Sequence, residues 1–199
     1  MNVLLSERVV ASRLVLVRHA STEWSRAGRH TGRTDLPLDE AGREGARELR
    51  RRLAPLEAVA VYSSPLKRAL ETCEIAGFAG RVEVTEDLME WDYGDYEGKT
   101  TSEIWESRPH WELFADGCPN GETAADVGAR IDLFLDQIAT APEGHGDIVC
   151  FAHGHLLRVL TARWVRLWPE EGRRFLLDAG HLGILGYERE TRVVAAWNA

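Results

Sequence analysis

Short, unbroken runs of apolar residues constrain this chain more than any other feature of its sequence. RLVLV at 13–17, AVAVY at 58–62 and DIVCFA at 147–152 are the right length for strands and too short for ordinary helices. Continuous apolar runs are typical of strands in a parallel sheet that is covered on both faces. The sequence therefore predicts an α/β fold, a three-layer sandwich with a mostly parallel central sheet and helices on both faces.

The segments between these runs carry helix signals. Asp39 is expected to cap a helix that runs to about Leu53, and Ser64-Pro65 to open another. Thr123 with Asp126 resembles a capping box. The same reasoning predicts a short strand at 81–85, a buried helical face at Val127, Ile131, Phe134, Leu135 and Ile138, a helix from Leu156 to Trp168 stopped by Pro169, and a terminal hairpin of GILGY and VVAAW.

Residues 87–122 lose this regular periodicity and are rich in Trp, Tyr, Asp and Gly. We interpret them as an irregular insertion over the active-site edge, which caps the substrate within a single domain spanning 1–199. Trp91, Trp105 and Trp111 in or near it would form either an aromatic wall for the substrate or a small core, and a core is the commoner outcome.

Charge and composition exclude several classes of function. The 199 residues carry a net charge of −8, which argues against broad binding to nucleic acid or an anionic membrane. No apolar run approaches the roughly 20 residues that span a bilayer, and Glu7 and Arg8 interrupt the N-terminal apolar stretch, so we expect a cytoplasmic protein. The three cysteines and the pair His153 and His155 lack the spacing of a disulfide framework or a zinc site, so no metal is expected.

Basic side chains follow three of the predicted strands. Arg18 and His19 end the first, Arg68 comes shortly after the second, and His153 ends the buried strand at 147–152. Because the carboxyl ends of parallel strands meet at one edge of a sheet, these side chains are expected to converge. Arginine forks match phosphate oxygens and a neutral histidine is a competent nucleophile, so the cluster suits phosphoryl transfer.

Phosphoryl transfer from an ester also requires a proton donor for the leaving alkoxide. Glu90, at the start of the irregular segment, is the candidate for that role. A second Arg-His pair, Arg29-His30, lies in a loop with no strand before it. The strand context carries the signal and the dipeptide alone does not.

Several motifs occur in an order that resembles the histidine phosphatase superfamily, in the branch that contains cofactor-dependent phosphoglycerate mutase. The resemblance covers about residues 13 to 187 and rests on LVLVRHASTEW, RHTGRTDLPLDEAG, YSSPLKRALET, LMEWDYGDYEG, CPNGETAADV and FAHGHLLRVL. It implies that His19 is transiently phosphorylated, with neither a metal nor a cofactor. It also implies a phosphate pocket of Arg18, Arg68 and His153, a proton donor in Glu90, and substrate contacts at Ser25, Thr31, Gly32 and Tyr93. Gly154 and His155 are further candidates for substrate contact, and capping of the following helix is the alternative for His155.

The sequence departs from the commonest family pattern at Ala20, Ser21 and Ser25, which bears on substrate choice. Only Lys99, Arg108 and Arg130 are basic between residues 91 and 152, where mutases carry a segment that grips phosphoglycerate. We therefore expect a metal-independent phosphatase that hydrolyses small phosphate monoesters through a phosphohistidine. A mutase dependent on a bisphosphoglycerate primer and a catalytically silent phosphoester-binding module are the alternatives. The oligomeric state stays open, with a homodimer as one outcome.

Overall fold

Six strands form one mixed sheet in the part of the chain that the computed structural model describes, residues 13–139 and 146–199. Their order is β3-β2-β4-β1-β5-β6. β1, β2, β3 and β4 run parallel, whereas β5 and β6 are antiparallel to their neighbours. The strands are β1 (Arg13–Arg18), β2 (Ala58–Ser63), β3 (Glu83–Val84), β4 (Asp147–Ala152), β5 (Leu182–Glu188) and β6 (Thr191–Ala196).

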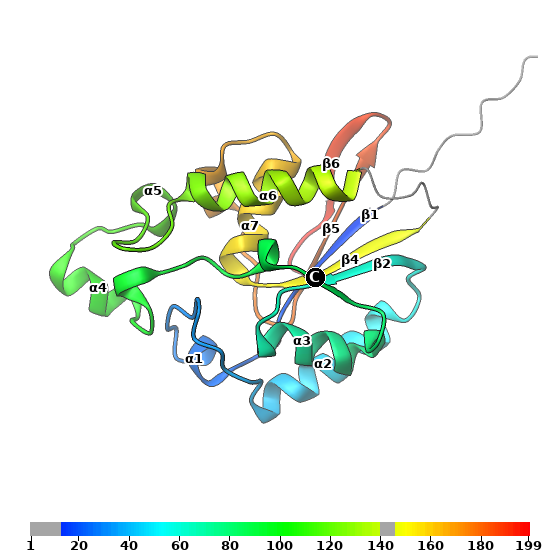
Figure 1. Cartoon of the computed structure of the whole chain (residues 1–199), viewed down its shortest axis with the longest axis horizontal. Coiled ribbons are helices and arrows are strands. Elements are labelled where there is room, and N and C mark those ends of the chain that lie inside the picture. The colour runs from blue at the N-terminus through cyan, green and yellow to red at the C-terminus, as the bar shows by residue number, and fades with distance from the viewer. Residues whose placement is uncertain (1–12, 140–145) are drawn as a thin grey trace, which may run out of the picture.

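Helices cover both faces of this sheet, as Figure 1 shows. Along β1, Leu14 and Leu16 join the core beneath α6 (Ala124–Ala139) and α7 (Gly154–Trp164). Val15 and Val17 join a second core beneath α2 (Glu40–Leu53) and α3 (Lys67–Cys73). Successive residues of β1 point to opposite faces of the sheet, and the residues on both faces are buried. The strand therefore has no polar face, which confirms the predicted three-layer α/β sandwich.

Two of the predicted helix starts are confirmed by their caps. The Asp39 carboxylate accepts a hydrogen bond from Gly42 N at 2.7 Å and begins α2. Thr123 and Asp126 exchange hydrogen bonds in a capping box ahead of α6. All five residues of the predicted apolar face of α6 are buried.

Two other helix boundaries differ from the prediction. α3 begins at Lys67 and not at Pro65, because Leu66 stays extended and its N–H donates to Ser64 Oγ at 3.3 Å. α7 begins at Gly154 and ends at Trp164, earlier than predicted, because Arg166 adopts a left-handed φ of 61°. Pro169 then starts a 3₁₀ helix at Pro169–Arg174.

The segment 87–122 consists of short elements beyond the carboxyl ends of the parallel strands (Figure 1). Trp91 and Trp111 are buried in the core, whereas Trp105 is half exposed. The two buried indoles therefore belong to the core, as the commoner of the two outcomes predicted. The elements are the 3₁₀ helices Glu86–Leu88 and Gly94–Tyr96, α4 (Thr101–Ser107) and α5 (Leu113–Asp116); a further short helix, α1 (Glu23–Arg26), follows β1.

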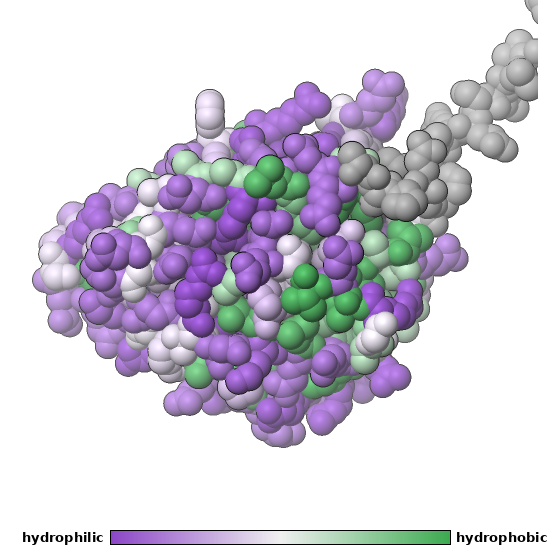
Figure 2. Space-filling view, in the orientation of Figure 1, coloured by the Kyte–Doolittle hydropathy of each residue, from purple (hydrophilic) through white to green (hydrophobic). Residues whose placement is uncertain are grey.

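The surface in Figure 2 is mostly hydrophilic, with apolar side chains gathered over the β2–β3 edge of the sheet. Val59 and Val84 on these strands are about half exposed. No helix in residues 13–139 or 146–199 combines the length and hydropathy that crossing a bilayer requires.

Candidate active site

His19 and His153 lie side by side because they follow neighbouring parallel strands. Arg18 of β1 pairs with Ala152 of β4, and His19 N donates to Ala152 O at 2.8 Å. The two imidazole centroids are 5.2 Å apart. Sheet register alone therefore brings together two residues that are 134 positions apart in the sequence.

The hydrogen bond of His19 to its own chain fixes its tautomer. Nδ1 lies 2.8 Å from Ala20 O, and a carbonyl oxygen only accepts, so Nδ1 carries the proton. Nε2 therefore presents a lone pair, and no described residue bonds to it. Burial, with the charges of Arg68 and Arg18, holds the pKa of His19 well below its ordinary value of 6.5. The ring is thus a neutral nucleophile with a free Nε2.

His153 has the opposite tautomer. Arg68 Nε donates to its Nδ1 at 3.1 Å, so the ring proton sits on Nε2 and points to Ser64 Oγ at 2.8 Å. Burial and the neighbouring Arg68 charge hold the pKa of His153 well below its ordinary value. His153 is therefore a neutral hydrogen-bond donor beside the nucleophile.

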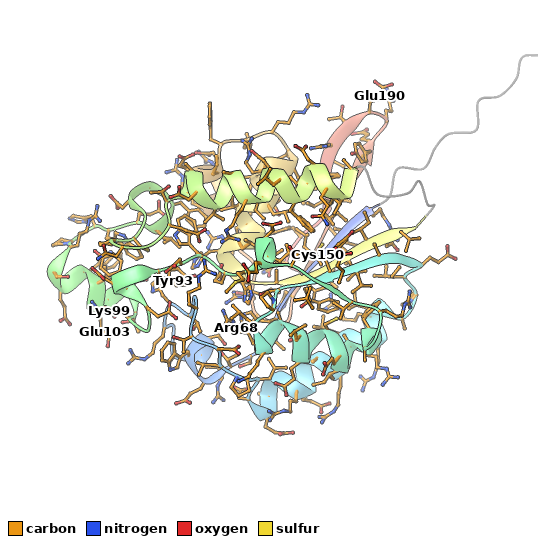
Figure 3. The ribbon with its side chains drawn as sticks, viewed as in Figure 1. Arg68, Tyr93, Lys99, Glu103, Cys150 and Glu190 are labelled. Carbon is orange, nitrogen blue, oxygen red and sulfur yellow. The ribbon has the colours of Figure 1, made fainter. Side chains whose placement is uncertain are left out.

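Arg68 is fully buried and joins His153 to a loop. Its Nη1 donates to Thr34 O, and its Nη2 donates to Thr31 O and Gly32 O, each at 2.9 Å. Together with the bond to His153, these contacts use most of the five donors of the guanidinium. Figure 3 shows Arg68 at the end of the sheet that faces Tyr93 and the insertion.

Arg18 brings a second guanidinium to the site. Its Nη1 donates to Leu177 O at 2.5 Å, while its Nε is buried with no hydrogen-bond partner among the described residues. An unmet buried donor of this kind costs free energy unless a ligand or water meets it. The guanidinium of Arg18 packs closely against Gly154, and only glycine permits this, since a Cβ at position 154 would lie 2.9 Å from Arg18 Cζ.

Glu90 lies at the N-terminus of α7. Its Oε1 accepts from Leu156 N and Trp91 N, both at 2.9 Å, and its Oε2 accepts from His155 N at 3.1 Å. Arg130 holds the segment around it through the carbonyl oxygens of Asp87, Met89 and Glu90. These three backbone N–H groups fix the position of the Glu90 carboxyl group beside His155.

Tyr93 and His155 form the wall next to Glu90. Tyr93 Oη lies 2.6 Å from His155 Nδ1. Burial and the nearby Glu90 raise the pKa of Tyr93 well above its ordinary value, so the hydroxyl keeps its proton. Burial together with the Arg158 charge holds the pKa of His155 well below its ordinary value, so its ring is neutral.

Three of the residues assigned to the substrate by resemblance have their polar groups engaged within the protein. Ser25 Oγ donates to Thr22 O and accepts from Thr22 N in the cap of α1. Thr31 Oγ1 donates to Arg29 O, and Gly32 N donates to the Glu97 carboxylate at 2.9 Å.

Three residues around the site were missed by the sequence analysis. Ser64 accepts the His153 proton, and Glu97 accepts the N–H groups of Gly32 and Thr34. His30 packs edge-on against Tyr93 with centroids 4.9 Å apart. The search for polar residues at strand ends does not find Glu97 or His30, because both lie in irregular segments. Ser64 directly follows β2, so the same search could have found it. No cluster of three metal-ligating side chains occurs among the described residues.

Three comparisons relate the chain to known proteins. The family described as "Histidine phosphatase superfamily (branch 1)" matches residues 14–199. An acid phosphatase of Mycobacterium tuberculosis is 42% identical over 92% of this chain and 90% of its own, and a sedoheptulose 1,7-bisphosphatase of Saccharomyces cerevisiae is 34% identical over 88% and 87%. A solved structure from M. tuberculosis has a TM-score of 0.88 at 40% identity and covers 94% of this chain and 97% of that one. The resemblance seen in the motifs is confirmed, and the chain belongs to the histidine phosphatase superfamily.

Proposed function

We propose that this phosphoric monoester hydrolase transfers the phosphoryl group of a small phosphate monoester first to His19 and then to water. Two observations carry the proposal: neutral His19 has a free Nε2 lone pair, and the charge of Arg18, whose buried Nε has no partner among the described residues, acts on His19. A neutral nucleophile and a cationic donor at the same edge of the sheet are suited to binding and attacking an anionic phosphoryl group.

In the first step, His19 Nε2 attacks phosphorus while the bond from phosphorus to the alcohol oxygen breaks. Glu90 gives its proton to that oxygen, so the alcohol leaves neutral. In the second step, the Glu90 carboxylate takes a proton from water, the water oxygen attacks phosphorus, and the P–N bond breaks to release phosphate. Arg18 and Arg68 stabilise the charge on the transferring oxygens through their positive charges, and His153 does so when its Nε2–H exchanges Ser64 Oγ for a phosphoryl oxygen.

A mutase that needs a bisphosphorylated primer is the second candidate. It would use the same phosphohistidine and pass the phosphoryl group to a second hydroxyl. The more similar relatives carry phosphatase names, and few basic residues lie between positions 91 and 152, both of which favour hydrolysis. A silent binding module is disfavoured because the similar relatives carry the names of enzymes.

The test is phosphate release from p-nitrophenyl phosphate in the presence of a chelator, for the native chain and His19→Ala. We expect release from the native chain and none from the variant, together with an acid-labile, base-stable phosphoryl adduct on the native chain alone. Turnover in His19→Ala would overturn the assignment of the nucleophile. Turnover that requires a bisphosphate primer and yields an isomer would favour the mutase.

The proposal also includes residues 87–122 as the part that caps the substrate, a homodimer, and a cytoplasmic site of action. The apolar group at the β2–β3 edge supports self-association (Figure 2). Free thiols at Cys73, Cys118 and Cys150 support a reducing compartment. Sedimentation velocity tests the dimer, and we expect twice the monomer mass.

A further inference from the structure

Arg130 is a mostly buried cation that the proposed reaction does not use. It lies on α6, and its Nε and Nη2 donate to the two carboxylate oxygens of Glu122 at 2.8 and 3.0 Å. Its Nη1 donates to Asp87 O at 2.8 Å and to Met89 O at 2.7 Å, and Nη2 also donates to Glu90 O at 3.3 Å. These bonds use all five N–H groups that a guanidinium has. Arg130 therefore has no donor left for a substrate oxygen, and its contacts all serve Glu122 and the segment 87–90.

Glu122 holds the continuation of this segment. Its Oε2 accepts from Asp92 N at 2.8 Å in addition to the Arg130 guanidinium. Its backbone N–H donates to Asp92 O at 2.9 Å, and its carbonyl oxygen accepts from Trp91 Nε1 at 2.8 Å. We call Arg130 and Glu122 the Arg130–Glu122 pair. The pair thus fixes residues on both sides of Glu90 in the chain.

The carboxyl group of Glu90 joins the segment 87–92 to α7. It accepts from Leu156 N at 2.9 Å and from His155 N at 3.1 Å, both in the first turn of α7. α6, which carries Arg130, packs against α7, so the pair ties the segment to the same layer of helices. A shift of about 1 Å in a catalytic group lowers a rate by up to about a hundredfold. The effectiveness of Glu90 is therefore expected to depend on the pair.

We propose that the Arg130–Glu122 pair positions Glu90 for the transfer of its proton to the departing alcohol oxygen. The inference rests on the proposed function, because it assigns positioning residues to the proton donor of that reaction. If the pair served only to stabilise the fold, its loss would slow the reaction of every substrate by a similar factor. If it positions the proton donor, its loss slows most the esters whose alcohols need a proton in order to leave.

The test compares p-nitrophenyl phosphate with phenyl phosphate. The two esters are similar in shape, but phenolate is a much stronger base than p-nitrophenolate and depends more on a proton when it leaves. For each ester, kcat/KM covers the steps up to the departure of the alcohol. The ratio of the two values, p-nitrophenyl over phenyl, therefore reports on proton donation.

We expect Arg130→Lys to raise this ratio about tenfold above the native value. Lysine lacks the fork that holds Glu122 and the three carbonyl oxygens together, but it keeps the positive charge that acts on His153. Loss of folded protein or of the phosphate pocket lowers both kcat/KM values and cancels in the ratio.

Two further variants keep the test decisive. Arg163→Lys is the matched control, because Arg163 makes the same kind of forked pair with Asp132 on α6, at 2.8 and 2.9 Å. Its ratio should stay within about twofold of the native value. Glu122→Gln keeps one oxygen that accepts from Arg130 and should raise the ratio about threefold. This variant also covers the case in which Arg130→Lys fails to fold.

A double variant tests whether the pair acts through Glu90. Glu90→Gln removes the proton donor and should raise the ratio by itself, by at least as much as Arg130→Lys does. When Arg130→Lys is added to Glu90→Gln, the ratio should change less than twofold, because the group that Arg130 positions is already absent.

The outcomes separate this inference from the proposed function. An unchanged ratio in Arg130→Lys, an equal rise in Arg163→Lys, or a further tenfold rise in the double variant overturns the positioning role while the phosphatase assignment stands. An unchanged ratio in Glu90→Gln overturns both the proton donor and its positioning and leaves the role of His19 in place. Absence of release from the native chain, or turnover in His19→Ala, removes the proposed function and this inference with it.

Discussion

Two groups of side chains lie at the same edge of the sheet but are held in place differently. One is the strand-end pair, His19 and His153, and the other is the cluster of His30, Tyr93 and His155. The strand-end pair follows β1 and β4, whose register fixes both backbones. His30 lies in an irregular loop and is held by Lys99 O, a contact across 69 residues. The two histidines of the strand-end pair are thus positioned by the sheet, whereas His30 is positioned by a contact between loops.

This difference separates chemistry from specificity. Substitutions in the loops would change which alcohol is accepted and leave the sheet edge intact. Arg68 belongs to both regions, because it bonds His153 on one side and the loop carbonyls of Thr31, Gly32 and Thr34 on the other. It is therefore the residue whose replacement should have the largest effect.

We expect Arg68→Lys to lower kcat/KM for p-nitrophenyl phosphate about a thousandfold. An ammonium group lacks the fork that reaches His153 Nδ1 and three carbonyl oxygens together, so the phosphate pocket and the loop both lose their support. Steady-state kinetics and circular dichroism of the folded variant measure the effect. Arg43→Lys is the matched control, because Arg43 pairs with Glu71 at the partly exposed surface of α2. Near-native activity in Arg68→Lys would show that the two regions do not depend on one guanidinium.

The same contrast explains how much of the fold followed from the sequence. Short apolar runs determine strands wherever both faces are covered, and β1, β2 and β4 were found in this way. The start of α3 was not predicted, because Leu66 stays extended with its N–H bonded to Ser64 Oγ, and Ser64 in turn bonds to His153 at the end of a remote strand. The end of α7 was not predicted either, because no local sequence pattern indicates the left-handed conformation of Arg166.

For the site, the strand-end residues were found because topology places them, whatever the neighbouring side chains are. Glu97 was missed because its function lies in accepting backbone N–H groups 63 and 65 residues away. His30 was missed for a similar reason, since its surroundings come from the insertion. Side chains that bond to the backbone of a distant loop leave no periodic signal in the sequence.

Glu97→Gln tests the loop side of the comparison. The Glu97 carboxylate accepts from Gly32 N and Thr34 N, while Arg68 binds carbonyls of the same loop. A neutral amide accepts these bonds more weakly and sets its own N–H₂ group near them, so the loop should loosen. We expect kcat/KM to fall about tenfold, mainly through KM. Glu106→Gln, at an exposed position on α4, is the control. A loss as large as that of Arg68→Lys would place Glu97 in the chemistry and contradict the division.

The smallest effect concerns the free energy of unfolding in acid. The unfolded chain binds protons as pH falls through the ordinary histidine pKa of 6.5, whereas burial lowers the pKa of His19, His153 and His30 in the folded chain. The unfolded state therefore binds more protons below pH 6.5, and stability falls as the pH falls. Each such histidine contributes at most about 1 kcal/mol of loss between pH 6.5 and 5.5.

Denaturant unfolding at the two pH values measures this loss, and His30→Phe should reduce it by up to about 1 kcal/mol because one neutral histidine is removed. His110→Asn is the control: His110 is exposed, and asparagine tolerates its φ of 66°. An unchanged acid loss in His30→Phe would mean that His30 is protonated in the folded chain. It would then be a cationic group suited to an anion, and the contrast between a charged phosphate pocket and the neutral cluster of His30, Tyr93 and His155 would fail.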